Sequence, residues 1–167
     1  MKHIRANDYI NTMRNYLKSY NYYMQYLSNA RETVKDIDRQ LATESIKVSR
    51  YGNETGGGSS DGLTLVEKSA SLRIKLEREK QDLLSSSLAI ESLMTRITNT
   101  MQRLSPEEQR IVREFYIEEQ TYESMARTHI CSPRWCRKRL RLAEEKMAFM
   151  MFGPRATDSI RFIETGA

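Results

Sequence analysis

The chain has 167 residues and a net charge of +5, with 29% charged residues, 8% aromatic residues and three prolines. This composition predicts a soluble, helical protein of one or two small domains. No run approaches the ~18 consecutive apolar residues of a membrane helix, so no membrane partner is expected. The N-terminus, MKHIRANDYIN, lacks the apolar core of a secretory signal peptide, which predicts a cytoplasmic location.

The basic charge is concentrated in one short segment. Residues 1–50 carry a net charge of +4, residues 51–103 balance at seven basic and seven acidic residues, and residues 104–152 carry nine and eight. Within the last segment, residues 132–142 hold five basic and no acidic residues. A local cationic stripe predicts a nucleic-acid contact surface, and a solvated helix face is the alternative.

Residues 6–49 are predicted to form one long helix, because no glycine or proline lies between His3 and Tyr51. A helix of this length cannot bury its apolar stripe against itself, so it needs a partner helix. The stripe repeats in steps of three and four and makes one short step after Leu27; it comprises Ile10, Met13, Leu17, Tyr20, Met24, Leu27, Ala30, Val34, Ile37 and Leu41.

Tyrosine is dense in the first half of this helix. Stacking on single-stranded nucleic acid is one interpretation. Packing in the seam or at a protein interface is the favoured one, because the tyrosines follow a helical pattern and not a basic groove. They are Tyr9, Tyr16, Tyr20, Tyr22, Tyr23 and Tyr26.

Residues 51–62, YGNETGGGSSDG, hold five of the seven glycines and are predicted to be a flexible hinge. A phosphate-binding loop is disfavoured, because no GK[ST] ending follows and no strand precedes it. Residues 63–103 continue the three-four spacing as a second long helix. The simplest geometry for residues 1–103 is therefore an antiparallel, coiled-coil-like hairpin.

The second helix has a wider apolar stripe than one neighbour requires. Leu84, Leu88 and Met94 lie beside the main seam. Two helices alone have little interior, so a bundle of two hairpins is plausible. A homodimer through the hairpin is thus a candidate assembly.

Residues 104–152 are predicted to form a small helical domain. Ser105, Pro106 and Glu108 make a capping box that starts its first helix. Thr121 caps the second helix, in which Met125 and Ala126 face inward. His129–Ile130–Cys131 forms the turn, and Ser132–Pro133 opens the third helix.

The third helix sorts its residues onto two faces. On a helical wheel, Cys136, Leu140, Ala143 and Met147 form a core stripe. Four cations occupy an arc of roughly 100° on the opposite side. Arg139 points away from that arc and shares a side stripe with Trp135 and Leu142. The cations are Arg134, Arg137, Lys138 and Arg141.

This pattern predicts a helix-turn-helix whose third helix enters the major groove of DNA. Residues near the start of a recognition helix lie closest to base edges, which favours Pro133, Arg134, Arg137 and Lys138 as readers. Arginine can grip phosphate or guanine, and lysine mainly phosphate. A structural three-helix bundle with a basic solvent face is the alternative. The predicted DNA contacts are Thr121, Tyr122, Ser132, Pro133, Arg134, Arg137, Lys138 and Arg141.

No catalytic residue, metal ligand or cofactor site is predicted. His129 has no acidic or cysteine partner at a useful spacing, so it is interpreted as a turn residue. Cys131 and Cys136 have no second cysteine pair nearby and are interpreted as reduced, buried side chains. No nucleophile, base and orienting group come together, so the chain is not expected to be an enzyme.

The run LSPEEQRIVREFYIEEQTYESMARTHICSPRWCRKRLRLAEEKM, about 45 of the 167 residues, resembles region four of bacterial sigma factors. The opening Leu104–Ser105–Pro106–Glu107, the Met125–Ala126 pair and the Ser132 start match that pattern. His129–Ile130 departs from it, since sigma factors usually have Leu-Gly there.

Residues 153–167 are predicted to be a C-terminal tail. The layout of a long helical N-terminal part followed by a sigma-like domain resembles the ArpU and RinA type of phage late-gene regulators. This resemblance implies a transcription regulator in a bacterial host's cytoplasm that activates late packaging, morphogenesis or lysis genes. Host RNA polymerase is then a candidate partner. The alternatives are a structural or DNA-packaging protein, such as a small terminase subunit, and a sigma factor that melts promoters, with the tyrosine-rich segment as its only candidate melting region.

Overall fold

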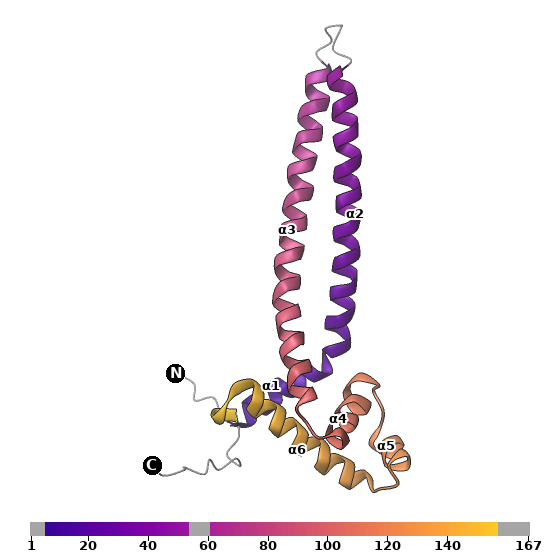
Figure 1. The fold of residues 1–167 in the computed structure, drawn as a ribbon, viewed down its shortest axis with the longest axis vertical. Helices are drawn as coiled ribbons and strands as arrows, with labels where there is room; N and C mark the ends of the chain where they lie inside the picture. The colour runs from indigo at the N-terminus through magenta and orange to yellow at the C-terminus, as the bar shows by residue number, and fades with distance from the viewer. Residues whose placement is uncertain (1–5, 54–60, 157–167) are drawn as a thin grey trace. The chain divides into compact units, whose positions relative to one another are not determined.

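The computed structural model describes residues 6–53 and 61–156. These residues form helices joined by short turns, with no strand among them, so the predicted all-α class is confirmed. The middle of the predicted hinge (residues 54–60) and most of the tail (residues 157–167) lie outside the described residues. In chain order (Figure 1) the elements are α1 (Ala6–Lys18), α2 (Tyr20–Asn53), α3 (Asp61–Gln102), α4 (Pro106–Val112), the π-helix η1 (Arg113–Ile117), α5 (Tyr122–Thr128), α6 (Pro133–Phe152) and the 3-10 helix η2 (Pro154–Ala156). Among the helices that the structure describes, none combines the length and apolar character needed to cross a membrane.

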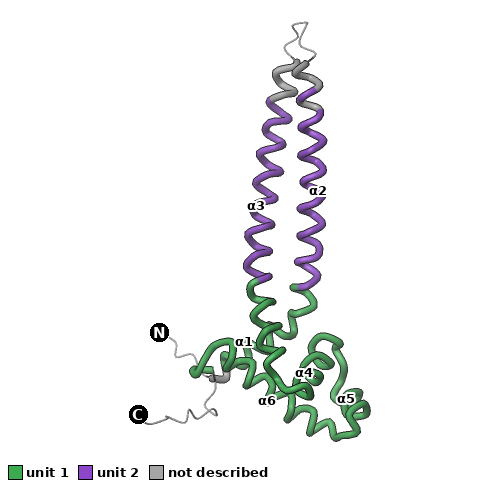
Figure 2. The backbone as a smooth tube through the Cα atoms, viewed as in Figure 1, with its two compact units in different colours: residues 1–23, 92–167 green, residues 24–91 purple. Residues whose placement is uncertain are grey.

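The chain divides into two compact units (Figure 2). Unit 1 contains Met1–Tyr23 and Ser92–Ala167, and unit 2 contains Met24–Glu91. The sequence analysis divided the chain after residues 103 and 152 instead. The difference arises because α1 and the end of α3 are bound to the C-terminal helices: Arg96 Nη2, for example, donates to the Met151 carbonyl at 3.1 Å.

The predicted uninterrupted helix over residues 6–49 is wrong, because a turn at Ser19 separates α1 from α2. The Ser19 N–H still donates to the Asn15 carbonyl (3.1 Å), and its carbonyl accepts from the Tyr23 N–H (3.0 Å). These bonds preserve most of the helical ladder, which is why neither glycine nor proline marks the turn. The change in exposure does reveal the turn. Leu17, which precedes it, is fully buried, whereas Met24, which follows it in the predicted apolar stripe, is 48% exposed.

In unit 1 the other helices pack around α6. Helices α1, α4 and α5 each contact it, and α1 also contacts η1 and η2. The largest fully buried side chains of the described residues are Met13, Leu17, Ile97, Ile111, Val112, Met125, Cys136, Leu140 and Met147. The core is therefore built from α1, the end of α3, and α4 to α6 together.

The predicted helix caps and the predicted core stripe of residues 104–152 are confirmed. Ser105 and Glu108 form the capping box of α4, and Thr121 caps α5. The predicted core stripe of α6 (Cys136, Leu140, Ala143 and Met147) is at most 2% exposed. Gly153 ends α6 with a φ of 78°, a left-handed conformation that glycine adopts without strain.

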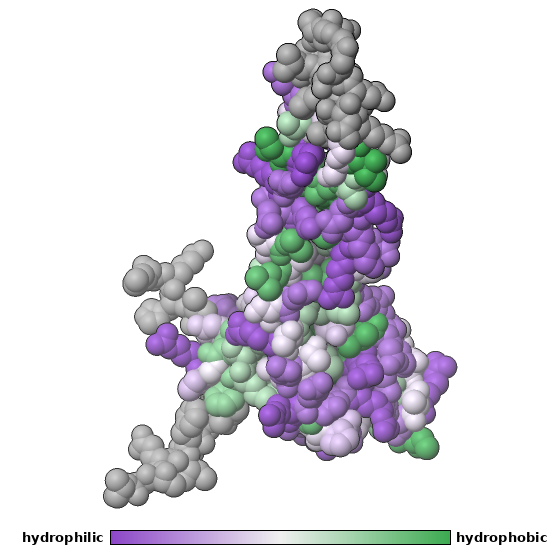
Figure 3. Space-filling model, turned by 45° about the horizontal axis from the view of Figure 1, so that its top comes forward, coloured by the Kyte–Doolittle hydropathy of each residue, from purple (hydrophilic) through white to green (hydrophobic). Residues whose placement is uncertain are grey.

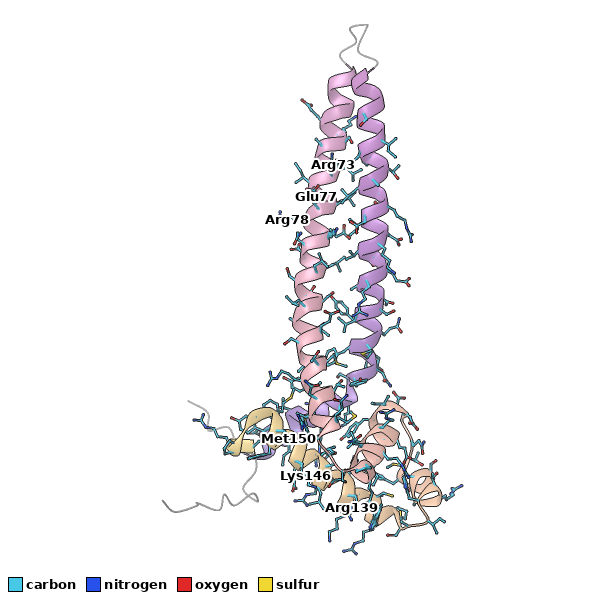
Figure 4. All side chains as sticks on the ribbon, viewed as in Figure 1. Arg73, Glu77, Arg78, Arg139, Lys146 and Met150 are labelled. Carbon is cyan, nitrogen blue, oxygen red and sulfur yellow. The ribbon has the colours of Figure 1, made fainter. Side chains whose placement is uncertain are left out.

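In unit 2, α2 and α3 lie side by side and run in opposite directions (Figure 1). Polar contacts join them along their length, including Ser69 Oγ to Glu44 Oε2 (3.0 Å) and Lys80 Nζ to Asp38 Oδ1 (2.6 Å). Arg73 and Glu77 lie one turn apart on α3 (Figure 4), 3.9 Å from each other. Where the structure describes the side chains of this unit, the buried apolar residues are Leu27, Ala30, Ile37 and Leu76.

The tyrosines of the first two helices take different environments. The rings of Tyr9 and Tyr16 lie 5.4 and 6.4 Å from the ring of Phe152 on α6, which supports the packing interpretation for these two. The Tyr26 hydroxyl bonds to Ser86 Oγ at 3.1 Å. Tyr22 is 77% exposed.

Candidate nucleic-acid interface

The start of α6 is set by its first residues. Ser132 has the extended backbone of an N-cap residue, and its hydroxyl accepts from the Trp135 N–H at 3.2 Å. Pro133 occupies the first helical position, where its missing N–H costs nothing. No acidic residue lies in the first turn of α6. The positive end of the helix dipole is therefore not neutralised by a side chain there and can attract an anion.

Four predicted contact residues share the solvent side of α6. Arg134, Arg137, Lys138 and Arg141 are all exposed, on the side of the helix away from the buried stripe. Arg141 Nε donates to Glu145 Oε1 at 2.9 Å, one turn along the same helix. In the described part of the chain, the other three have no carboxylate within 4.0 Å, so their charges are not neutralised locally.

Arg137 rests on an aromatic platform that the sequence did not reveal. Its guanidinium carbon lies 5.0 Å from the centre of the Tyr122 ring. That ring stacks on Phe115, with centroids 4.7 Å apart and planes at 25°. The half-buried Tyr122 thus supports Arg137 across the α5–α6 crossing, and only the packing of these helices brings the two together.

Thr121 and Ser132 lie at the starts of the two helices that flank the turn. The Thr121 hydroxyl accepts from the Ser124 N–H at 3.2 Å, as the Ser132 hydroxyl does from Trp135. Both side chains are therefore held in place by capping. Each hydroxyl keeps its proton, which remains able to donate to a phosphate oxygen.

Arg139 differs from the four exposed cations, as the helical wheel predicted. Its Nη2 lies 3.4 Å from Glu107 Oε2 on α4, and its guanidinium carbon lies 5.5 Å from the centre of the Trp135 ring. Figure 4 shows Arg139 and Lys146 on α6. These contacts occupy Arg139 within the unit.

Two buried carboxylates hold the inward-facing side of α6 against the neighbouring helices of unit 1. Glu144 accepts from Arg14 Nε and from the Tyr116 hydroxyl, both at 2.6 Å, and so ties α1 and η1 to α6. Burial, and then the bond to Glu144, raises the pKa of Tyr116 well above its ordinary value.

Glu108 makes the corresponding link from α4. Lys146 Nζ lies 2.5 Å from Glu108 Oε1. Burial of the Glu108 carboxyl raises its pKa, but the bonds to Lys146 and Ser105 outweigh this effect and leave the pKa below its ordinary value. Glu108 therefore stays ionised and keeps both its ion pair and its helix cap.

The turn between α5 and α6 is held by a contact that could not be predicted from the spacing of residues in the sequence. His129 Nε2 lies 2.6 Å from Glu114 Oε2, and both side chains are nearly buried. The prediction that His129 lacks an acidic partner is wrong, because Glu114 lies 15 residues earlier, on η1. The wider winding of this π-helix, with the Glu118 N–H bonded to the Arg113 carbonyl at 3.0 Å, accompanies burial of both Glu114 and Tyr116.

The two remaining turn residues have distinct properties. Ile130 has a φ of 52° and is 94% exposed, although branched side chains disfavour this backbone conformation. The sulfurs of Cys131 and Cys136 lie 3.4 Å apart, and burial, followed by this contact, raises the pKa of Cys136 to about 11. Cys136 is therefore a protonated, unreactive thiol at neutral pH.

Comparison of the chain with protein-family models, with curated proteins and with solved structures gave no match.

Proposed function

We propose that the chain is a sequence-specific DNA-binding transcription regulator in which α5 and α6 form a helix-turn-helix. The observation that supports this most is the exposed cationic face of α6, which lies opposite a fully buried stripe and is mostly unpaired. An α-helix fits the major groove of B-DNA, and phosphates favour a surface with this charge.

The position of each of the four cations on α6 determines whether it would contact bases or phosphates. Arg134 and Arg137 lie in the first turns of α6, where a recognition helix approaches base edges. Stacking on Tyr122 restricts the Arg137 side chain, which lowers the entropy it loses on binding. Lys138 and Arg141 would bind phosphates, together with the hydroxyls of the capping residues Thr121 and Ser132.

The biological role rests on the resemblance to ArpU and RinA type regulators. It supports activation of late phage genes in the cytoplasm of a bacterial host, with host RNA polymerase as a second partner. We propose no enzymatic activity and no cofactor for this chain.

Selection of bound fragments from phage or host DNA, followed by band shifts at fixed salt, tests the proposal. Arg134→Ala and Arg137→Ala should each lower specific affinity by about 1–3 kcal/mol, or roughly 5- to 150-fold. Arg139→Ala is the matched control on the same helix and should bind almost as the unmodified protein does, because Arg139 is paired with Glu107. Unchanged binding by both test variants would exclude α6 as the recognition helix.

A further inference from the structure

Among its described residues, unit 2 exposes more large apolar side chains than it buries. Figure 3 shows hydrophobic residues lying among hydrophilic ones over the surface of α2 and α3. A pair of helices has little interior, and helices of this kind are normally stabilised by further helices. The exposed large apolar residues described in this unit are Met24, Ile46, Leu72, Ile74, Leu84 and Leu88.

Part of this exposed surface forms a groove of about 560 Å³ between α2 and α3. On the α2 side its apolar lining is small, Ala30 and Val34, and on the α3 side it is large, Leu84 and Leu88. Ile74 lies two heptads before Leu88 and continues the same face of α3. The α2 side of the groove therefore leaves spaces between small side chains, and the α3 side presents large side chains that could fill such spaces.

The charges beside the groove are also divided between the two helices. Arg31 and Lys35 line it from α2, and Glu91 lines it from α3. Arg31 Nη2 and Glu91 Oε1 are 2.7 Å apart, so an ion pair joins the two walls. One wall is thus small and basic, and the other is large and acidic.

We propose that this groove is occupied by the same groove of a second copy of the chain, related by a two-fold axis parallel to the helices. That axis places α2 of each copy against α3 of the other, in antiparallel directions and at the same level. Leu84 and Leu88 then enter the holes beside Ala30 and Val34. The result is a four-helix bundle with an isologous interface.

Charge distinguishes this arrangement from the other two-fold pairing. With the axis along the helices, the wall that holds Arg31 and Lys35 faces the partner's wall that holds Glu91, and attraction favours the pair. An axis across the helices would place α2 against α2, so that the basic wall of one copy faces the basic wall of the other. Like charges in such a position oppose association, so they select the first arrangement.

The available surface is large enough for a stable dimer. The part of α2 in unit 2 is about 45 Å long, and two helices side by side are about 20 Å wide. The buried face is then on the order of 900 Å² per copy, close to the ~800 Å² per partner of stable interfaces. This dimer does not depend on DNA binding, so either proposal can fail without the other.

Light scattering and sedimentation equilibrium of the full chain without DNA test the proposal. The expected mass is about 39 kDa, twice the 19.6 kDa of the chain. Leu84→Glu should give a monomer with unchanged helical circular dichroism. Leu72→Glu is the matched control, since Leu72 and Leu84 are 42% and 43% exposed but only Leu84 lines the groove, and it should remain a dimer.

A second measurement tests the pairing. Chains with Val34→Cys and chains with Leu84→Cys are mixed in a background of Cys131→Ser and Cys136→Ser that retains its helical content. Oxidation should join the two kinds of chain to each other and not Val34→Cys chains among themselves. The proposal would be overturned if the unmodified protein were a monomer or an oligomer larger than a dimer. It would also be overturned if the Leu84→Glu variant remained a dimer, or if Val34→Cys chains coupled to one another.

Discussion

Unit 1 and unit 2 are both helical, yet they bury their side chains to different extents. All of the largest fully buried side chains among the described residues lie in unit 1. In unit 2 the buried positions alternate with exposed ones, and Leu88 is 68% exposed. Under the proposal made above, the helix pair of unit 2 buries its exposed apolar side chains against a second copy, whereas unit 1 completes its core within the chain.

The polar contacts of the two units differ in the same way. In unit 1, Glu144 is almost fully buried between Arg14 and Tyr116. In unit 2, the Arg31–Glu91 pair is exposed on both sides, and exposed pairs contribute only about 0–1 kcal/mol. This exposed ion pair therefore contributes little to the stability of unit 2.

The largest expected effect compares two positions on the single helix α3. Ile97 is fully buried in unit 1, and Ile97→Ala should lower the free energy of unfolding by about 2–5 kcal/mol. Leu88→Ala in unit 2 should change it by less than about 0.5 kcal/mol in protein diluted until it is monomeric. Urea unfolding followed by circular dichroism measures both values. Equal costs would show that the two units do not differ in burial as described.

A smaller loss is expected from the buried carboxylate of unit 1. Glu144→Ala removes the acceptor of both Arg14 and Tyr116 and should destabilise the protein by about 2–3 kcal/mol, since Arg14 is partly exposed and can regain water. Glu145→Ala, its neighbour, removes only the contact to the exposed Arg141 and should cost less than about 0.5 kcal/mol. Thermal unfolding of both variants separates these cases, and similar melting temperatures would contradict the role given to Glu144.

The smallest effect is a gain in stability at the turn. Ile130→Asn should stabilise the protein by about 1 kcal/mol, because asparagine tolerates the left-handed backbone that isoleucine resists. The side chain of Ile130 is exposed, so little burial is lost. Ile130→Val keeps the branching at Cβ and should unfold as the unmodified protein does. A stability gain in the valine variant, or a loss in the asparagine variant, would refute the presence of strain there.

The sequence predicted features that depend on neighbouring residues. Ser105, Thr121 and Ser132 act as caps because their hydroxyls reach N–H groups three residues ahead, and helical periodicity sorted α6 correctly. The turn at Ser19 escaped prediction because it leaves the local hydrogen bonds in place.

Contacts between distant residues were not accessible from spacing. Glu144 binds Arg14, which lies 130 residues earlier in the sequence. His129 binds Glu114, which lies on a π-helix that no sequence propensity indicated. The Tyr122 platform under Arg137 likewise depends on how two helices cross. The widened stripe at Leu84 and Leu88 was visible in the sequence, but the division of the groove into a small basic wall and a large acidic wall was not.

The central claim, that the exposed face of α6 binds DNA, is tested most directly by the salt dependence of binding to a random-sequence duplex, measured by fluorescence anisotropy. The logarithm of the binding constant should fall linearly with the logarithm of salt concentration, with a slope of about −0.9 for each phosphate contacted. Lys138→Ala should reduce the magnitude of that slope by about 0.9, and Arg139→Ala should leave it unchanged. A slope near zero for the unmodified protein, or equal slopes for all three proteins, would contradict the assignment of α6 as the DNA-binding helix.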